Sequence, residues 1–115
     1  MSRVVITGMG IVAPVGQTAS DFFDGLLAAR SGIRPVTSDV HPSPGSLVAG
    51  RIDFDPSAYW PAHQSAQFDR ATQFALAAAR QAFADAALDL TPDESERAGL
   101  YWGTGLGGAT SIEDS

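Results

Sequence analysis

The chain contains no cysteine among its 115 residues. It therefore has no disulfide framework, no thiolate metal site and no cysteine nucleophile within these residues. Its two histidines, His41 and His63, are too few and too far apart to suggest a zinc site. Lysine is also absent, so all seven basic residues are arginines, and the net charge is -6. An acidic chain of this kind is a poor general binder of nucleic acid.

Long apolar runs are missing as well, because no segment reaches the roughly 18 apolar residues that a membrane span needs. The first 13 residues weakly resemble a signal peptide, but glycines interrupt them, Pro14 follows directly, and no clear small-x-small cleavage site comes after it. With 44% hydrophobic and 17% charged residues, the composition is that of a globular protein with one modest domain. We therefore expect a cytoplasmic protein that does not associate with membranes.

The first motif present is a short apolar run that leads into a glycine turn, VVITGMGIVAPVG at residues 4–16. Val4 to Thr7 is too short for a helix and is closed by glycine, so it predicts a strand buried on both faces. Gly8 and Gly10 bracket one methionine. This spacing indicates either a positive φ or a backbone packed too closely for a side chain. An apolar strand that runs into a glycine turn is typical of α/β proteins.

Two helices are predicted. The first covers about residues 20–29, with Thr18 as its N-cap and Gly32 as the residue that stops it. The second covers about residues 69–87 and is rich in alanine, the best helix former. A line of mostly small side chains lets such a helix approach its neighbours closely, so we expect it inside a layered structure. The line consists of Phe68, Ala71, Ala75, Ala78, Ala82 and Ala86.

Between these helices, residues 31–62 hold five prolines and are expected to form an irregular surface flap. Residues 47–54 within it predict a short edge strand interrupted at Gly50, and Tyr59 and Trp60 are expected to hold the flap in place.

The last segment, residues 98–108, combines a predicted buried strand, Ala98 to Trp102, with the glycine-rich loop GTGLGG. A fresh strand, a glycine loop and the first turn of a helix are an unusual end for a domain. We therefore expect this chain to be the front part of a longer protein.

Two interpretations of the first motif compete. GMGIVA matches the G-x-G-x-x-G/A pattern of dinucleotide-binding proteins through its two glycines and Ala13. In such a site the helix begins within the loop, whereas Pro14 and Gly16 delay it here. The site also needs a second strand that ends in an acidic residue about 20 residues later, where this chain predicts a helix end and a turn. A dinucleotide-binding α/β protein is therefore the less favoured interpretation.

The favoured interpretation rests on several motifs in a fixed order: VVITGMGIVAPVG, a short helix, ARSGI, FDRATQFALAAARQAFADAAL and GTGLGG. This ordered set resembles the N-terminal part of the β-ketoacyl-ACP synthases of the elongation type and covers essentially the whole chain. The resemblance implies an α/β, thiolase-like layered αβαβα fold, of which residues 1–115 are the N-terminal part and whose catalytic part lies beyond the chain. It also implies a homodimer or a ketosynthase-like heterodimer.

The activity implied by the resemblance is a decarboxylative Claisen condensation of an acyl thioester with malonyl-ACP, in fatty acid or polyketide biosynthesis. In the family a cysteine accepts the acyl group, while two histidines and an oxyanion hole stabilise charge. All three side chains lie downstream, so no catalytic residue is expected here, and His41 and His63 match neither family histidine. No metal or cofactor is implied, because acyl carrier protein delivers the substrates on its phosphopantetheine. A partner subunit of the chain-length-factor type, which keeps the fold without the cysteine, is the alternative.

One site element is expected inside the chain. The family's glycine-rich loop borders the acyl pocket, so Gly105, Leu106 and Gly107 are predicted to bind substrate, with Leu106 as the gate. The alternative is that Leu106 belongs to the core and the glycines only permit close packing. Relatives also often carry a basic cluster that meets the acidic carrier protein. Here the corresponding stretch, PAHQSAQFD, has no Lys or Arg before Arg70.

Overall fold

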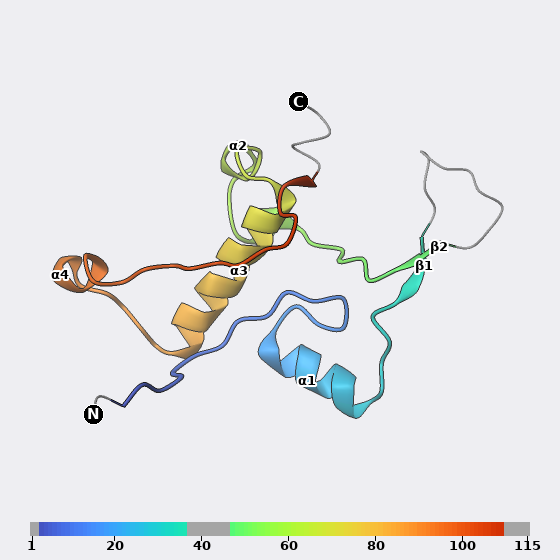
Figure 1. Cartoon of the computed structure of the whole chain (residues 1–115), viewed down its shortest axis with the longest axis horizontal. Helices are drawn as coiled ribbons and strands as arrows, with labels where there is room; N and C mark the ends of the chain where they lie inside the picture. The colour runs from blue at the N-terminus through green and yellow to red at the C-terminus, as the bar shows by residue number, and fades with distance from the viewer. Residues whose placement is uncertain (1–2, 37–46, 110–115) are drawn as a thin grey trace. The chain divides into compact units, whose positions relative to one another are not determined.

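The computed structural model describes residues 3–36 and 47–109 of the chain (Figure 1). The chain forms two compact units, one from Ile11–Phe54 and one from Met1–Gly10 together with Asp55–Ser115. The helix start expected at residues 111–115 lies outside the described residues. The first unit holds α1 (Ala19–Leu27), β1 (Arg34–Val36) and β2 (Leu47–Ala49), and the second holds the 3-10 helix η1 (Pro56–Ala58), α2 (Ala62–Ser65), α3 (Arg70–Asp85) and α4 (Pro92–Ser95).

Helix α1 begins where the sequence predicts, because the Thr18 hydroxyl accepts a hydrogen bond of 3.1 Å from the Asp21 N–H. Its end differs slightly from the prediction. The helix stops at Leu27, and Ala29 takes a left-handed φ of 52°. The chain therefore turns before it reaches Gly32, the residue expected to stop the helix. An alanine in this conformation carries no sequence signal, since glycine and asparagine are the usual residues there.

The segment predicted to be an irregular flap, residues 31–62, is more ordered than expected within its described part. β1 pairs with β2 in antiparallel register, with Arg34 opposite Ala49 and Val36 opposite Leu47. The sequence predicted the second of these strands, although it is shorter than the expected 47–54, and missed β1. Pro35 lies at the centre of β1 and argued against a strand there, because proline cannot donate a hydrogen bond to a neighbouring strand. Proline is tolerated in edge strands, and both strands of a two-stranded sheet are edge strands.

The predicted anchors of the flap, Tyr59 and Trp60, do contact α3. The Tyr59 hydroxyl accepts a hydrogen bond of 3.0 Å from the Gln81 side chain, and its carbonyl oxygen accepts one from the guanidinium of Arg80. The Trp60 ring lies edge-on to Phe68, with ring centroids 6.2 Å apart. These contacts hold the η1–α2 region, the last part of the predicted flap, against α3.

Helix α3 is the central element of its unit and bears out the helix predicted at residues 69–87. Ala75, Ala77 and Ala78 are buried, and the line of small side chains faces the glycine turn near the N-terminus. A β-carbon on Gly8 would lie 2.2 Å from the Ala82 carbonyl oxygen. Among the described residues, Gly108 is the one glycine with a positive φ. Of the two explanations for the glycines before and after Met9, close backbone packing is therefore the correct one.

The two buried strands predicted at Val4–Thr7 and Ala98–Trp102 do not form within the described residues. Both segments run as drawn-out traces without a strand (Figure 1), and Val4, Ile6 and Tyr101 are 95%, 87% and 94% exposed. A strand requires a neighbour whose backbone groups pair with its own. The one sheet in this part of the chain is the β1–β2 pair, in the other unit. Both the strand assignment and the burial predicted for these apolar runs are therefore wrong for the described residues.

The core of the described chain is small. Its buried hydrophobic residues are Phe54 and three alanines of α3, while many large apolar side chains are exposed. The layered αβαβα arrangement is accordingly not visible in residues 3–36 and 47–109. No helix in this part of the chain is long and apolar enough to cross a bilayer.

Candidate functional site

A cavity of about 300 Å³ lies beside the N-terminal half of α3. This volume is at the lower end of the range for small-molecule sites. One wall comes from the start of α3 and the other from the segment that leads into the glycine-rich loop. The lining residues are Asp69, Ala71, Thr72, Ala75 and Leu76 on the helix side, and Leu100, Trp102, Thr104 and Gly107 on the other.

Asp69 supplies a charged group at this cavity, and its hydrogen bonds define its role. One carboxylate oxygen accepts a hydrogen bond of 3.0 Å from the Thr72 N–H, and the other accepts one of 2.8 Å from the Thr72 hydroxyl. These two hydrogen bonds favour the ionised carboxylate and hold the pKa of Asp69 below its usual range. Asp69 therefore stays ionised and caps α3, which makes it a poor candidate for a general base.

The glycine-rich loop passes directly beside Asp69. Gly108 takes a φ of +77°, and a β-carbon there would lie 3.7 Å from the Asp69 carboxyl carbon. Only glycine adopts this left-handed conformation at low cost. The loop therefore turns at Gly108 and brings Gly107 to the cavity wall.

The three predicted substrate-binding residues occupy different positions. Gly107 lines the cavity, whereas Gly105 does not, and a β-carbon on Gly105 would meet no atom within 4 Å. Leu106 is 76% exposed and is not a lining residue. Leu106 is therefore not a core residue in the described part of the chain. Its role as a gate of the acyl pocket stays a prediction.

Sequence reasoning missed the apolar wall of the cavity, which consists of Leu76, Leu100 and Trp102. Leu76 lies four residues after Thr72 and so shares its face of α3. That spacing is the sequence signal that could have placed Leu76 at the cavity. The other two residues were assigned to a buried strand, which concealed their contribution to a cavity.

The dinucleotide interpretation of the first glycine motif fails on geometry. A β-carbon on Gly10 would lie 1.8 Å from the Ala78 carbonyl oxygen, and one on Gly8 would be nearly as close to Ala82. A dinucleotide site needs this backbone open to a pyrophosphate, whereas here α3 occupies the space. Packing explains both glycines.

The one histidine among the described residues, His63, adds no site. His63 lies exposed on α2, and His41 lies outside the described residues. Among residues 3–36 and 47–109, no group of His, Asp and Glu side chains is arranged to hold a metal ion.

Comparison with known proteins identifies the family of the chain. All of residues 1–115 match the family model described as "Beta-ketoacyl synthase, N-terminal domain". The chain belongs to the beta-ketoacyl synthase family. This membership confirms the resemblance drawn from the order of the motifs.

Three relatives are similar to this chain over nearly its whole length. The 3-oxoacyl-[acyl-carrier-protein] synthase 2 of Coxiella burnetii is 39% identical over 112 residues, covering 96% of this chain and 27% of that protein. The granaticin polyketide putative beta-ketoacyl synthase 1 of Streptomyces violaceoruber is 42% identical over 114 residues, with coverages of 97% and 27%. The tetracenomycin polyketide synthase ketoacyl synthase alpha subunit of Streptomyces glaucescens is 39% identical over 112 residues, with coverages of 96% and 26%. The chain thus spans about a quarter of the length of the relatives it matches.

Proposed function

We propose that residues 1–115 are the N-terminal part of an acyl-carrier-protein-dependent condensing enzyme of fatty acid or polyketide biosynthesis. The observation that carries this proposal is the match of the whole chain to the ketosynthase family. The names of its relatives add the carrier protein in one group and polyketide synthesis in the other. The fold that goes with this proposal is the thiolase-like layered αβαβα fold.

The proposed reaction has two stages. In the first, a cysteine thiolate outside residues 1–115 attacks the acyl thioester of one carrier protein, forms the acyl-enzyme and releases the carrier thiolate, which takes up a proton from water. In the second, malonyl-ACP loses carbon dioxide, and the resulting enolate carbon attacks the acyl-enzyme carbonyl. A 3-oxoacyl-ACP forms and the cysteine thiolate is restored, so atoms and charge balance without a redox cofactor or a metal.

In this reaction, residues 1–115 help to position the acyl substrate. The cavity between α3 and the glycine-rich loop is largely walled by apolar side chains, as an acyl chain requires. The loop itself can approach a substrate closely because four of its six residues are glycines. The proposal includes carrier protein as the partner, a homodimer or ketosynthase-like heterodimer, and a cytoplasmic location.

The test is condensation by the full-length protein. Acyl-ACP and malonyl-ACP are supplied together, and 3-oxoacyl-ACP is followed by mass spectrometry together with the release of carbon dioxide. The proposal expects both products in equal amounts. A matched reaction without acyl-ACP controls for malonyl decarboxylation that is not coupled to condensation. Absence of 3-oxoacyl-ACP from the protein alone and from any pair with a ketosynthase would reject the proposal.

The same experiment distinguishes a catalytic ketosynthase from the partner-subunit alternative. A chain-length-factor-type subunit would give no 3-oxoacyl-ACP alone but would change the length of the product when paired with a catalytic ketosynthase. The relatives named ketoacyl synthase alpha subunit and beta-ketoacyl synthase 1 favour the catalytic form.

A further inference from the structure

Two cavities lie along α3, and they share one wall. The first is the candidate site of about 300 Å³. The second has a volume of about 890 Å³ and extends along the C-terminal half of the helix. Among the described residues, Leu76 is the one that lines both cavities. The Leu76 side chain therefore lies between them.

The position of Leu76 on α3 explains why the two cavities meet there. Thr72 lies four residues before Leu76, and Ala79 and Phe83 lie three and seven residues after it, so the four side chains share one face of the helix. Thr72 lines the first cavity, while Ala79 and Phe83 line the second. Leu76 itself is half-buried. The two cavities are thus successive parts of one helix face, and Leu76 lies where they meet.

The second cavity is apolar where it meets this helix face, and Trp60 and Leu88 add further apolar surface to it. The charge of Arg80 in its lining is already engaged. The Arg80 guanidinium lies 5.8 Å from the centroid of the Trp60 ring and donates a hydrogen bond to the Tyr59 carbonyl oxygen. The polar residues of the lining are Gln64, Arg80 and Asp89. The part of the cavity next to Leu76 is therefore suited to an apolar chain.

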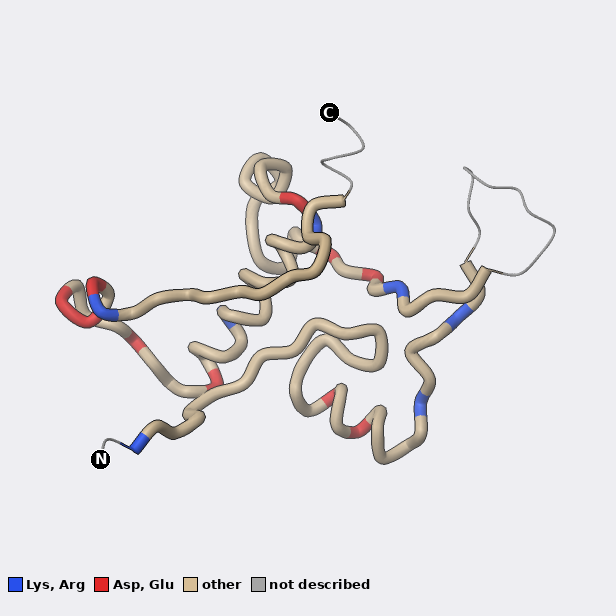
Figure 2. The backbone as a smooth tube through the Cα atoms, viewed as in Figure 1, with Lys and Arg blue, Asp and Glu red and all other residues tan. Residues whose placement is uncertain are grey.

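The charges of the chain lie away from this junction. Residues 71–79 of α3 contain no charged side chain, and this stretch of the helix is tan in Figure 2. An apolar ligand that passes Leu76 along the helix would therefore contact no ionised group of this stretch.

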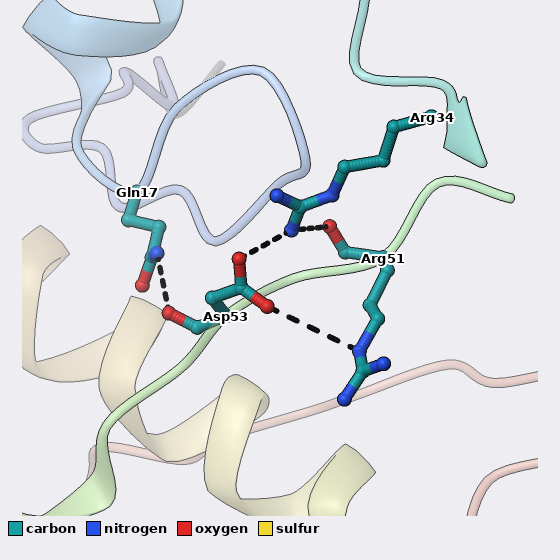
Figure 3. Close-up of polar contacts among 4 residues, drawn as sticks. All are labelled: Gln17, Arg34, Arg51 and Asp53. Carbon is teal, nitrogen blue, oxygen red and sulfur yellow. Dashed lines mark hydrogen bonds and ion pairs between the residues drawn. The ribbon is translucent and has the colours of Figure 1, made fainter. Parts of the chain in front are cut away.

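The cavity of the Ile11–Phe54 unit has the opposite character. Its volume is about 190 Å³, and its lining includes Arg34, Arg51 and Asp53. The Asp53 carboxylate lies 2.6 Å from Arg34 Nη2 and 4.0 Å from Arg51 Nε, and the Gln17 side chain donates a hydrogen bond of 3.0 Å to the Asp53 carbonyl oxygen (Figure 3). These polar groups already pair with one another, so this cavity does not suit an apolar ligand.

We propose that Leu76 sets the length of the acyl chain that the candidate site accepts, an inference that rests on the proposed function. Asp69 and Thr72, which supply polar groups to the first cavity, precede Leu76 on α3. The polar thioester end of an acyl group therefore lies towards them and the glycine-rich loop, and its methyl end points to Leu76. A chain that fills the first cavity ends at Leu76, and a longer chain must displace this side chain to reach the second cavity.

The test compares acyl-enzyme formation by the full-length protein across a series of acyl-ACP lengths. Leu76→Ala truncates the side chain to a methyl group and opens a path into the second cavity. The rate with the longest acyl groups, relative to the rate with acetyl, should therefore rise at least about tenfold. Leu76→Phe fills more of the same space, so this ratio should fall about tenfold. The two substitutions shift the length preference in opposite directions.

Leu27→Ala is the matched control. It makes the same truncation on α1, at a side chain that is 72% exposed and lines neither cavity. This variant should change the ratio less than about twofold. The melting temperature is measured beside the rates, because loss of folding lowers the rates at all lengths together and cannot produce opposite shifts in the two Leu76 variants.

An unchanged ratio in Leu76→Ala would overturn the inference, as would equal loss at every length in both Leu76 variants. In either case, acyl-enzyme formation by the wild-type protein would leave the proposed function standing. A wild-type protein that forms no acyl-enzyme with any acyl-ACP would reject the proposed function, and the inference with it.

Discussion

Gly10 lies so close to the backbone of Ala78 that a β-carbon on Gly10 would come within 1.8 Å of the Ala78 carbonyl oxygen. The same hypothetical atom would lie 2.9 Å from the Ala82 nitrogen. Nearby, the Met9 N–H donates a hydrogen bond of 2.9 Å to the carboxylate of Asp85. The glycine turn therefore packs directly against the backbone of α3 and is hydrogen-bonded to it through Asp85. This contact lies in the unit that carries the candidate site.

This contact predicts that Gly10→Ala destabilises the protein. The new methyl group meets main-chain atoms that cannot rotate away, so the backbone must shift, and overpacking of this kind typically costs about 1–3 kcal/mol. The midpoint of denaturant unfolding of the full-length protein measures the loss. Gly50→Ala is the control, because its β-carbon would meet the Pro14 and Ile33 side chains at 3.2 and 3.5 Å rather than backbone. Equal stability of both variants would refute the close packing.

A second prediction concerns pH and the cap of α3. Because the folded-state pKa of Asp69 lies below its ordinary value of 3.8, the ionised cap stabilises the protein above that value. The contribution is lost as the pH falls through the folded-state pKa. The substitution Asp69→Asn keeps a capping oxygen that does not titrate. The difference in unfolding free energy between wild type and Asp69→Asn should therefore shrink as the pH falls below 3.8. A difference that stays constant with pH would contradict this role.

Leu106 provides a prediction about substrate length. If the glycine-rich loop borders the acyl pocket, Leu106→Phe narrows it and should slow acyl-enzyme formation with long acyl groups more than with acetyl. Discrimination per methylene in an apolar pocket is about 1–3 kcal/mol, so the preference should shift by an order of magnitude or more. The rate across a series of acyl-ACP lengths is the measurement, beside the melting temperature. Equal slowing at every length, together with a lower melting temperature, would remove Leu106 from the site.

A further prediction follows from the small core. The buried hydrophobic residues of the described chain are Phe54, Ala75, Ala77 and Ala78, and no large side chain there is fully buried. This burial cannot offset the conformational entropy of folding. Residues 1–115 expressed alone should therefore show a broad thermal transition and poorly dispersed amide resonances. A sharp transition with well-dispersed resonances would contradict this expectation.

Local signals in the sequence predicted α1 and α3, because both are determined by neighbouring residues, whereas the short helices η1, α2 and α4 were not predicted. Thr18 and Asp69 cap α1 and α3 through side-chain oxygens that lie next to the helix starts. The small-residue face of α3 was also predictable, since a helical period is visible in the sequence. The fold family was predictable from the order of the motifs.

Features that depend on distant partners were not predictable. The burial of Val4–Thr7 depends on a neighbouring strand, which the local sequence does not specify. β1 was missed because its pairing with β2 outweighs the proline in its centre. The cavity is lined by Leu76 and Trp102, which lie far apart in the sequence, and the ion pairs of Asp53 bring Arg34 and Arg51 to one carboxylate. Neither arrangement has a local pattern.

The most direct test of the proposed condensing activity is the acyl-enzyme itself. The full-length protein is incubated with acyl-ACP alone, digested, and its peptides are examined by mass spectrometry. We expect one acylated cysteine outside residues 1–115, since this segment has none, and loss of the acyl group when malonyl-ACP is added. A protein that remains unacylated, or an acyl group that malonyl-ACP fails to discharge, would contradict the account.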